Sequence, residues 1–165
     1  MLVRSSGTIC SSFETCWRDL LALVGFLGLS LLVLAAHIAF SVDAAAVFLA
    51  WPEADWPWAA LYPLTGVAAW LVYRRVDVCV DRKRAALRIW GWQLLLSGLQ
   101  PAALFGAHSP ELALAVMARL LVALGLTMRA FLQLQRKAAL LLTPYAAWLC
   151  WAAYMSIDCF WFSGA

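Results

Sequence analysis

The sequence predicts an all-α membrane protein built as a bundle of five transmembrane helices. Hydrophobic residues make up 65% of the 165 residues, charged residues make up only 13%, and the mean hydropathy is +0.84. The apolar runs are continuous and rich in leucine and alanine, which are good helix formers, and they lack the alternation of membrane β-strands. Charged residues cluster between these runs, so most of the chain suits a hydrocarbon environment.

The first helix is predicted over residues 20–42, an uncharged run that is long enough to span a bilayer. A cytoplasmic N-terminal segment, residues 1–19, precedes it. A loop over residues 43–56 follows, because its two Trp-Pro pairs break the helix and suit the headgroup level. The second helix is predicted over residues 58–73.

The third, fourth and fifth helices are predicted over residues 89–105, 111–135 and 138–162. Six basic residues precede the third helix and cannot lie in hydrocarbon: Arg74, Arg75, Arg82, Lys83, Arg84 and Arg88. Ser109-Pro110-Glu111 combines an N-cap, a proline for the first helical position and an acid for the first turn, which is typical of a helix start. Arg136-Lys137 forms a short link between the last two helices.

The distribution of lysine and arginine predicts that the N-terminus lies inside and the C-terminus outside. Basic residues occur before the first helix, between the second and third, and between the fourth and fifth. The two other loops and the C-terminus have none. Short cytoplasmic loops keep lysine and arginine, and only an odd number of spans gives this alternation. The membrane domain is therefore expected over residues 20–162.

The chain shows no hydrolase triad, phosphate loop, paired catalytic carboxylates or metal-ligand spacing. We therefore predict no catalytic residue, no metal site and no required cofactor. The basic residues flank membrane segments and form no stripe with interleaved aromatics, so the expected partner is the lipid bilayer and not nucleic acid. The five cysteines show no C-x-x-C spacing, which gives no reason to expect a disulfide framework.

Ten tryptophans are more than interfacial girdles need, and Trp148 is the strongest candidate for a ligand contact. Its indole can stack on a flat molecule and donate a hydrogen bond. Its helical face also carries Tyr145, Ala152, Met155 and Ser156. Such a face can line a pocket or allow close helix packing, and both readings stay open. Trp51, Trp56, Trp58 and Trp161 are well placed to be girdle residues.

Among the ionisable residues inside the predicted spans, Arg119 is the strongest candidate for a functional role. It lies about 12 Å along the fourth helix from Glu111, at 1.5 Å per residue. It can form an ion pair with Asp158 of the fifth helix or anchor a ligand carboxylate. His37 and His108 lie toward the outer face, where a lone histidine supports no functional conclusion.

Prolines interrupt the second, third and fifth helices, at Pro63, Pro101 and Pro144. They remove backbone hydrogen bonds and bend the helices around whatever these enclose. Ser97 lies four residues before Pro101, so its carbonyl group is freed, and Gln100 adds a polar side chain. The bends make a cavity among the helices plausible.

Residues 142–148, Leu-Thr-Pro-Tyr-Ala-Ala-Trp, resemble the L-x-P-Y-x-x-W motif of the TspO/MBR family, the tryptophan-rich sensory proteins related to the mitochondrial translocator protein. Residues 90–94 and 105–106 resemble two further family motifs. The similarity runs from about residue 88 to 158 and extends more weakly to Trp56. The chain departs from the family pattern where Ser97 and Ser156 replace asparagine, Gly66 and Gln100 replace tryptophan, and Trp70 replaces tyrosine.

The resemblance implies a five-helix bundle, often a homodimer, that binds a porphyrin, haem or sterol-like molecule. The implied ligand-binding residues are Trp70, Ser97, Gln100, Trp148, Ala152, Met155 and Ser156, with Trp51 and Trp56 at the lid. A binding or sensory protein is the first hypothesis. The alternatives are an enzyme that promotes light-dependent porphyrin breakdown and a scaffold subunit of a membrane complex. The expected location is a bacterial cell membrane.

Overall fold

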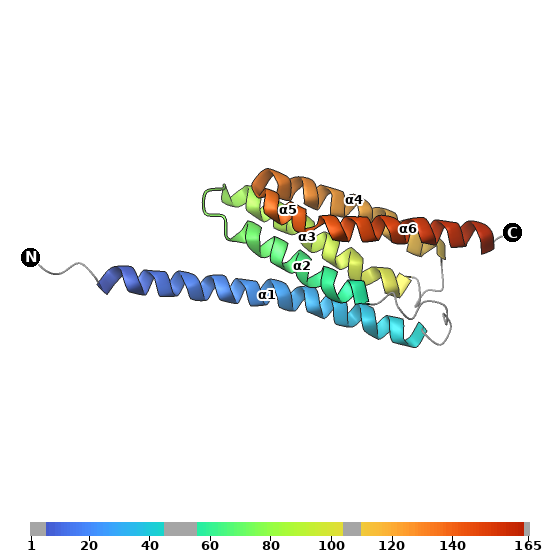
Figure 1. Ribbon diagram of the computed structural model, residues 1–165, viewed down its shortest axis with the longest axis horizontal. Coiled ribbons are helices and arrows are strands. Elements are labelled where there is room, and N and C mark those ends of the chain that lie inside the picture. Colours follow the sequence, from blue (N-terminus) through green and yellow to red (C-terminus); the bar gives the residue numbers. More distant parts are fainter. Residues whose placement is uncertain (1–5, 45–55, 104–109, 164–165) are drawn as a thin grey trace, which may run out of the picture.

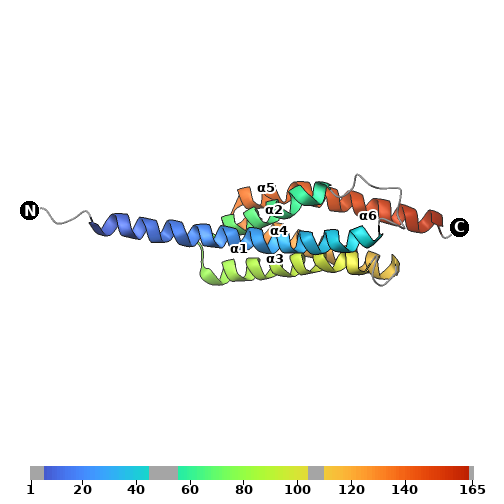
Figure 2. The same ribbon diagram turned by 90° about the horizontal axis from the view of Figure 1, so that it is seen from below.

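The computed structural model describes residues 6–44, 56–103 and 110–163, which form helices and the turns between them. The helical segments among these residues are α1 (Ser6–Ala44), α2 (Trp56–Tyr73), α3 (Val80–Pro101), α4 (Pro110–Leu134), α5 (Arg136–Leu141) and α6 (Thr143–Ser163). They lie side by side in an elongated bundle (Figures 1 and 2). α1 packs against α2 and α3, whereas α4 packs against α3, α5 and α6.

Two helices begin well before the residues predicted from the sequence. α1 begins at Ser6 and not near Leu20, and α3 begins at Val80 and not at Ile89. The predictions placed both starts at the first apolar residue, because charged side chains do not lie in hydrocarbon. Charge limits burial in a bilayer but does not prevent backbone hydrogen bonding, and arginine, lysine and alanine are good helix formers. Much of the basic segment is therefore a helical extension and not a loop.

The predicted fifth helix, residues 138–162, consists of two segments. α5 ends at Leu141 and α6 begins at Thr143, so the interruption lies at Leu142. Pro144 accounts for it, because proline has no backbone N–H and is tolerated only in the first turn of a helix. The Thr143 hydroxyl donates a hydrogen bond to the carbonyl oxygen of Leu140 at 2.7 Å, which satisfies one acceptor at the interruption.

α4 begins at Pro110 with Glu111 in its first turn, as the sequence pattern predicts. Ser109, the predicted N-cap, lies outside the described residues. After α4, Gln135 alone has an extended backbone, with φ −157° and ψ 109°. Gln135 is thus the single residue between α4 and α5. The Arg136-Lys137 pair, which the sequence predicts as a link, lies in the first turn of α5.

The core of the bundle is apolar, and so is much of its surface. Leu120, Leu124 and Phe131 of α4 are among the largest fully buried side chains. On the outside, Leu32 and Trp92 are each 65% exposed. A soluble protein rarely exposes such extensive apolar surface, whereas lipid covers it readily. Three stretches are long and apolar enough to cross a membrane: Cys16–Ala39, Leu114–Leu134 and Arg136–Met155. The chain is thus an all-α membrane protein.

Gly66 of α2 allows a close approach of α1. A Cβ atom added at Gly66 would lie 2.9 Å from Ser30 Oγ and 3.0 Å from the carbonyl oxygen of Phe26. Ser30 is fully buried and donates a hydrogen bond to that same carbonyl oxygen at 3.0 Å. A large side chain could not occupy this position while α1 lies where it does, because α1 fills the space that it would need.

Candidate functional site

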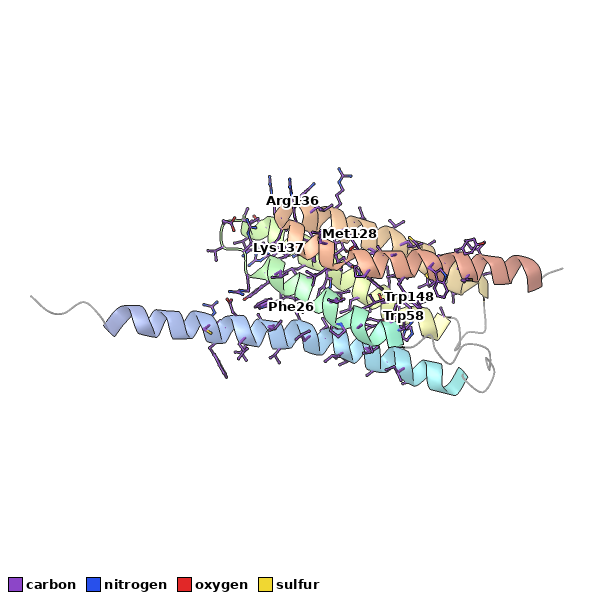
Figure 3. All side chains as sticks on the ribbon, in the orientation of Figure 1. Phe26, Trp58, Met128, Arg136, Lys137 and Trp148 are labelled. Carbon is purple, nitrogen blue, oxygen red and sulfur yellow. The ribbon has the colours of Figure 1, made fainter. Side chains whose placement is uncertain are left out.

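Aromatic rings from three helices meet around Trp58 of α2. The Trp58 ring centroid lies 4.9 Å from that of His37 in α1 and 5.9 Å from that of Tyr62 in α2. The rings of Tyr145 and Trp148 in α6 lie 6.1 and 6.3 Å away. We call these five residues the aromatic cluster. Trp58 and Trp148 lie close together near the end of the bundle where α2 begins (Figure 3).

Helical spacing explains how α2 and α6 each contribute two rings. Trp58 and Tyr62 are four residues apart in α2, and Tyr145 and Trp148 are three apart in α6, so each pair shares a helix face. The planes of Trp58 and Trp148 meet at 89°, an edge-to-face arrangement that aromatic pairs favour. Trp151 extends the row, with its centroid 4.8 Å from that of Trp148, and it is 39% exposed. The aromatic cluster and Trp151 together reach from the interior of the bundle to its surface.

A group of buried polar side chains adjoins the aromatic cluster. The hydroxyl oxygens of Ser97 in α3 and Tyr145 lie 2.9 Å apart. Ser97 also donates to the carbonyl oxygen of Gln93 at 3.0 Å, and because a hydroxyl has one hydrogen, Tyr145 is the donor to Ser97. The side chains of Tyr62 and Gln93 lie close enough to interact with this pair. The polar group therefore joins α2, α3 and α6.

Some polar atoms at the site are buried without a hydrogen-bond partner of good geometry among the described residues. They include Nε1 of Trp148, the hydroxyl of Tyr62 and Oε1 of Gln93. Leaving such an atom unsatisfied costs about 1–3 kcal/mol, and a bilayer offers no water in compensation. A ligand with acceptors and donors at its edge would satisfy them.

The other predicted ligand-binding residues lie at varying distances from this cluster. Ala152 is half-buried and packs against the core on α6, and Met155 is half-buried one turn later. Gln100 of α3 donates a hydrogen bond to Sδ of Met117 in α4 at 3.7 Å, so its amide is engaged between those helices. Ser156 lies in α6 and Trp56 begins α2, but their side chains are outside the described ones. Trp51 lies outside the described residues.

Trp70 is not brought to the aromatic cluster. It lies twelve residues after Trp58 in α2, roughly 18 Å along the helix at 1.5 Å per residue. Its Nε1 donates a hydrogen bond to the carbonyl oxygen of Asp19 at 2.9 Å. The guanidinium carbon of Arg74 lies 4.6 Å from its ring centroid. In this structure Trp70 attaches the first half of α1 to the end of α2.

Arg119 is exposed on α4 and not directed into the bundle. The predicted partner Asp158 lies in α6, but its side chain is outside the described ones, so the ion pair stays a prediction. Among the described residues, no group of three or more histidine, cysteine, aspartate and glutamate side chains could hold a metal ion.

The sequence predicts that Trp148 and Tyr145 share a face of the fifth helix, but it does not predict which rings meet that face. Trp58 was interpreted as a girdle residue and His37 as a lone interfacial histidine. The spacing of Trp58 and Tyr62 on one face of the second helix was a usable signal. Spacing within a helix does not show which other helix that face meets, so the cluster emerges only in three dimensions.

A helical bundle with apolar outer faces and a candidate site between its helices defines an integral membrane protein. The sequence model of the TspO/MBR family matches residues 55–162. The chain belongs to the TspO/MBR family, which confirms the resemblance seen in the sequence motifs. The matched region contains α2 to α5, all of α6 except its last residue, and most of the aromatic cluster, whereas α1 lies outside it.

Two relatives show the extent of the similarity. The chain is 30% identical over 114 residues to the tryptophan-rich protein TspO of Chlorobaculum tepidum, an alignment that covers 64% of this chain and 69% of the relative. It is 30% identical over 104 residues to the translocator protein of Homo sapiens, which covers 63% of this chain and 61% of the relative. This chain thus spans less than two thirds of the human relative.

Proposed function

We propose that the protein binds a flat hydrophobic ligand, a porphyrin or haem, at the aromatic cluster. The observation that carries this proposal is the Trp58–Trp148 pair with the unsatisfied indole N–H of Trp148. An indole face stacks on a flat ring, and the N–H can donate to a carboxylate at the ring's edge. A tetrapyrrole offers both features. A sterol has the flat shape without the carboxylates and is the alternative ligand.

Ligand entry between Trp58 and Trp148 requires a rearrangement of these rings. Stacked atoms lie about 3.5–4.0 Å apart, so a ligand held between two indoles needs parallel planes separated by about 7–8 Å. The rings now meet at 89° with their centroids 6.3 Å apart. Trp148 is half-buried and Trp58 is buried, so Trp148 is the ring that rotates.

The topology that accompanies this proposal is five spans with the N-terminus inside and the C-terminus outside. α2 and α3 lie alongside the three long apolar stretches, which supports their crossing the same membrane (Figure 2). The turn after α2 and the start of α5 lie at one end of the bundle (Figure 1). Both carry basic residues, which supports that end as the cytoplasmic one. A bacterial cell membrane as the host stays a prediction.

The test is a titration of the detergent-purified protein with protoporphyrin, haem and a sterol, followed by tryptophan quenching. We expect Trp148→Leu to weaken protoporphyrin binding by about three- to tenfold, because leucine keeps bulk but loses stacking and the N–H donor. Trp92→Leu is the matched control, since Trp92 is 65% exposed on α3. Equal affinity for protoporphyrin in the wild-type protein and in folded Trp148→Leu protein would show that Trp148 serves helix packing and does not contact the ligand.

Illumination of the complex separates binding from catalysis. A binding protein quenches and protects or releases the porphyrin unchanged, whereas an enzyme converts more than one equivalent of porphyrin per protein. We expect no turnover. Sustained turnover that depends on Trp148 would replace the binding proposal by the enzymatic alternative.

A further inference from the structure

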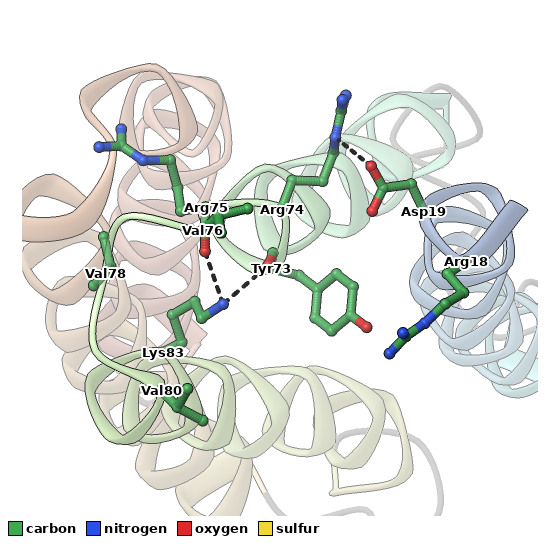
Figure 4. A pocket seen from close by; sticks show the side chains of 9 residues that line it. All are labelled: Arg18, Asp19, Tyr73, Arg74, Arg75, Val76, Val78, Val80 and Lys83. Carbon is green, nitrogen blue, oxygen red and sulfur yellow. Dashed lines mark hydrogen bonds and ion pairs between the residues drawn. The ribbon is translucent and has the colours of Figure 1, made fainter. Parts of the chain in front are cut away.

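A surface cavity of about 340 Å³ (Figure 4) is formed where α1 meets the turn after α2, at the opposite end of the bundle from the aromatic cluster. It is bordered by α1, the end of α2, the turn between α2 and α3, and the start of α3. Four basic side chains line it: Arg18, Arg74, Arg75 and Lys83. The rest of its lining is Asp19, the Tyr73 side chain and three valines, so the cavity is both cationic and apolar.

Two of the four basic residues already have carboxylate partners. Arg74 Nε lies 3.0 Å from a carboxylate oxygen of Asp19. Arg75 Nε donates to a carboxylate oxygen of Asp77 at 2.7 Å, and this hydrogen bond holds the pKa of Asp77 below its usual value. The Arg74–Asp19 pair joins the turn to α1, whereas the Arg75–Asp77 pair lies within the turn, and each pair matches one arginine with one carboxylate.

The other two basic residues form no ion pair with a carboxylate among the described residues. Lys83 Nζ donates to the carbonyl oxygen of Arg75 at 2.7 Å, which positions the ammonium group but does not neutralise it. Arg18 makes no ion pair with any residue that the structure describes. The Tyr73 ring lies between the two cationic groups (Figure 4). Positive charges thus lie on both sides of one aromatic ring, and Lys83 also acts electrostatically on Asp77.

We propose that this cavity binds the phosphate group of an anionic phospholipid. Guanidinium and ammonium groups are the usual protein ligands of phosphate. The lipid is favoured over a soluble phosphate compound because α1 continues from Arg18 into exposed apolar residues, with Leu20 50% and Val24 60% exposed. Acyl chains can lie along this surface while the phosphate meets Arg18 and Lys83. The proposal does not depend on tetrapyrrole binding at the other end.

The experiment is native mass spectrometry of the full-length protein released from nanodiscs. The nanodiscs contain equal amounts of phosphatidylglycerol, which is anionic, and phosphatidylcholine, which has no net charge. We expect retained phosphatidylglycerol adducts, and Arg18→Gln should reduce their affinity about fivefold, since one cation near a membrane surface contributes about a factor of five. Lys83→Gln should have a similar effect. Arg84→Gln is the matched control, because Arg84 is exposed beside Lys83 and does not line the cavity.

Each remaining outcome counts against the proposal. Equal retention of phosphatidylglycerol and phosphatidylcholine would show that the headgroup charge does not affect binding. An equal loss of phosphatidylglycerol affinity in Arg84→Gln would show that the general positive charge at this end of the bundle attracts the lipid, and that the cavity does not bind it specifically. Inorganic phosphate that competes with the lipid at equal concentration would assign the cavity to a soluble anion. Circular dichroism and thermal unfolding of each variant in detergent, measured in parallel, establish that it is folded.

Discussion

At the scale of single residues, the Ser97–Tyr145 hydrogen bond should stabilise the bundle as well as shape the site. Ser97→Ala leaves the buried Tyr145 hydroxyl without its acceptor at 2.9 Å. We expect the free energy of unfolding in detergent to fall by about 0.5–2 kcal/mol, the range for hydrogen bonds between membrane helices.

A double-variant cycle with Tyr145→Phe tests whether this stabilisation comes from the pair. If the hydrogen bond carries it, Ser97→Ala should have little further effect in the Tyr145→Phe background. Fully additive losses would assign the effect of each residue to its own packing, and the polar group would then have no demonstrated role in joining α3 to α6.

The exposed position of Arg119 leads to a prediction about ligand charge. Because its side chain is directed away from the bundle, we expect Arg119→Gln to change the affinities for protoporphyrin and for its dimethyl ester by the same factor, within about twofold. Arg129→Gln, exposed on the same helix, is the control. An anchoring arginine would instead weaken the free acid about tenfold more than the ester, since a charge-assisted hydrogen bond is lost.

Individual site residues were predictable from the sequence only as far as one helix at a time. The face of the fifth helix yielded Trp148 because residues three and four apart share a face. Trp70 was assigned to the same pocket through family resemblance, yet its indole contacts Asp19 in α1. Contacts between helices depend on crossing position and rotation, which no periodicity within one segment specifies.

At the scale of helices, Gly66 should be the most sensitive point of the α1–α2 contact. Gly66→Ala places a methyl group 3.0 Å from a backbone carbonyl oxygen in α1 that cannot rotate away. We expect a loss of about 1–3 kcal/mol in the free energy of unfolding, as for other overpacked positions.

Gly125→Ala is the matched control for this prediction. A Cβ atom at Gly125 has nothing within 4 Å, so alanine should be neutral or stabilise α4 by up to about 1 kcal/mol. Thermal unfolding of the two variants in the same detergent gives the comparison. Equal stability of both variants would mean that α1 does not lie against α2 as closely as described.

The existence of each helix was predictable, and the differences at helix ends have one physical origin. Hydropathy reports which residues tolerate hydrocarbon, whereas a helix requires only backbone hydrogen bonds and suitable side chains. α1 and α3 consequently extend past the apolar runs to Ser6 and Val80. The sequence predicts interruptions at Pro63 and at Pro144, and only the second is correct, because Pro63 lies inside the continuous helix α2.

At the scale of the whole molecule, the segregation of basic residues predicts a topology that can be measured directly. A reporter fused after Ala165 should appear on the opposite side of the membrane from one fused before Met1. Phosphatase and fluorescent-protein fusions, active on opposite sides of a bacterial inner membrane, provide the readout. Both termini on one side would leave an even number of spans and remove the five-span model.

The length of α1 has a mechanical consequence. Its 39 residues extend about 58 Å at 1.5 Å per residue, whereas a bilayer with headgroups is about 40–45 Å thick. α1 is fastened near Asp19 by Arg74 and Trp70, and the turns before that point extend past the rest of the bundle (Figure 1). Residues 6–17 thus continue α1 for roughly 18 Å past Asp19. By geometry, a ten-degree tilt of a straight α1 about Asp19 would displace its first residue by about 3 Å.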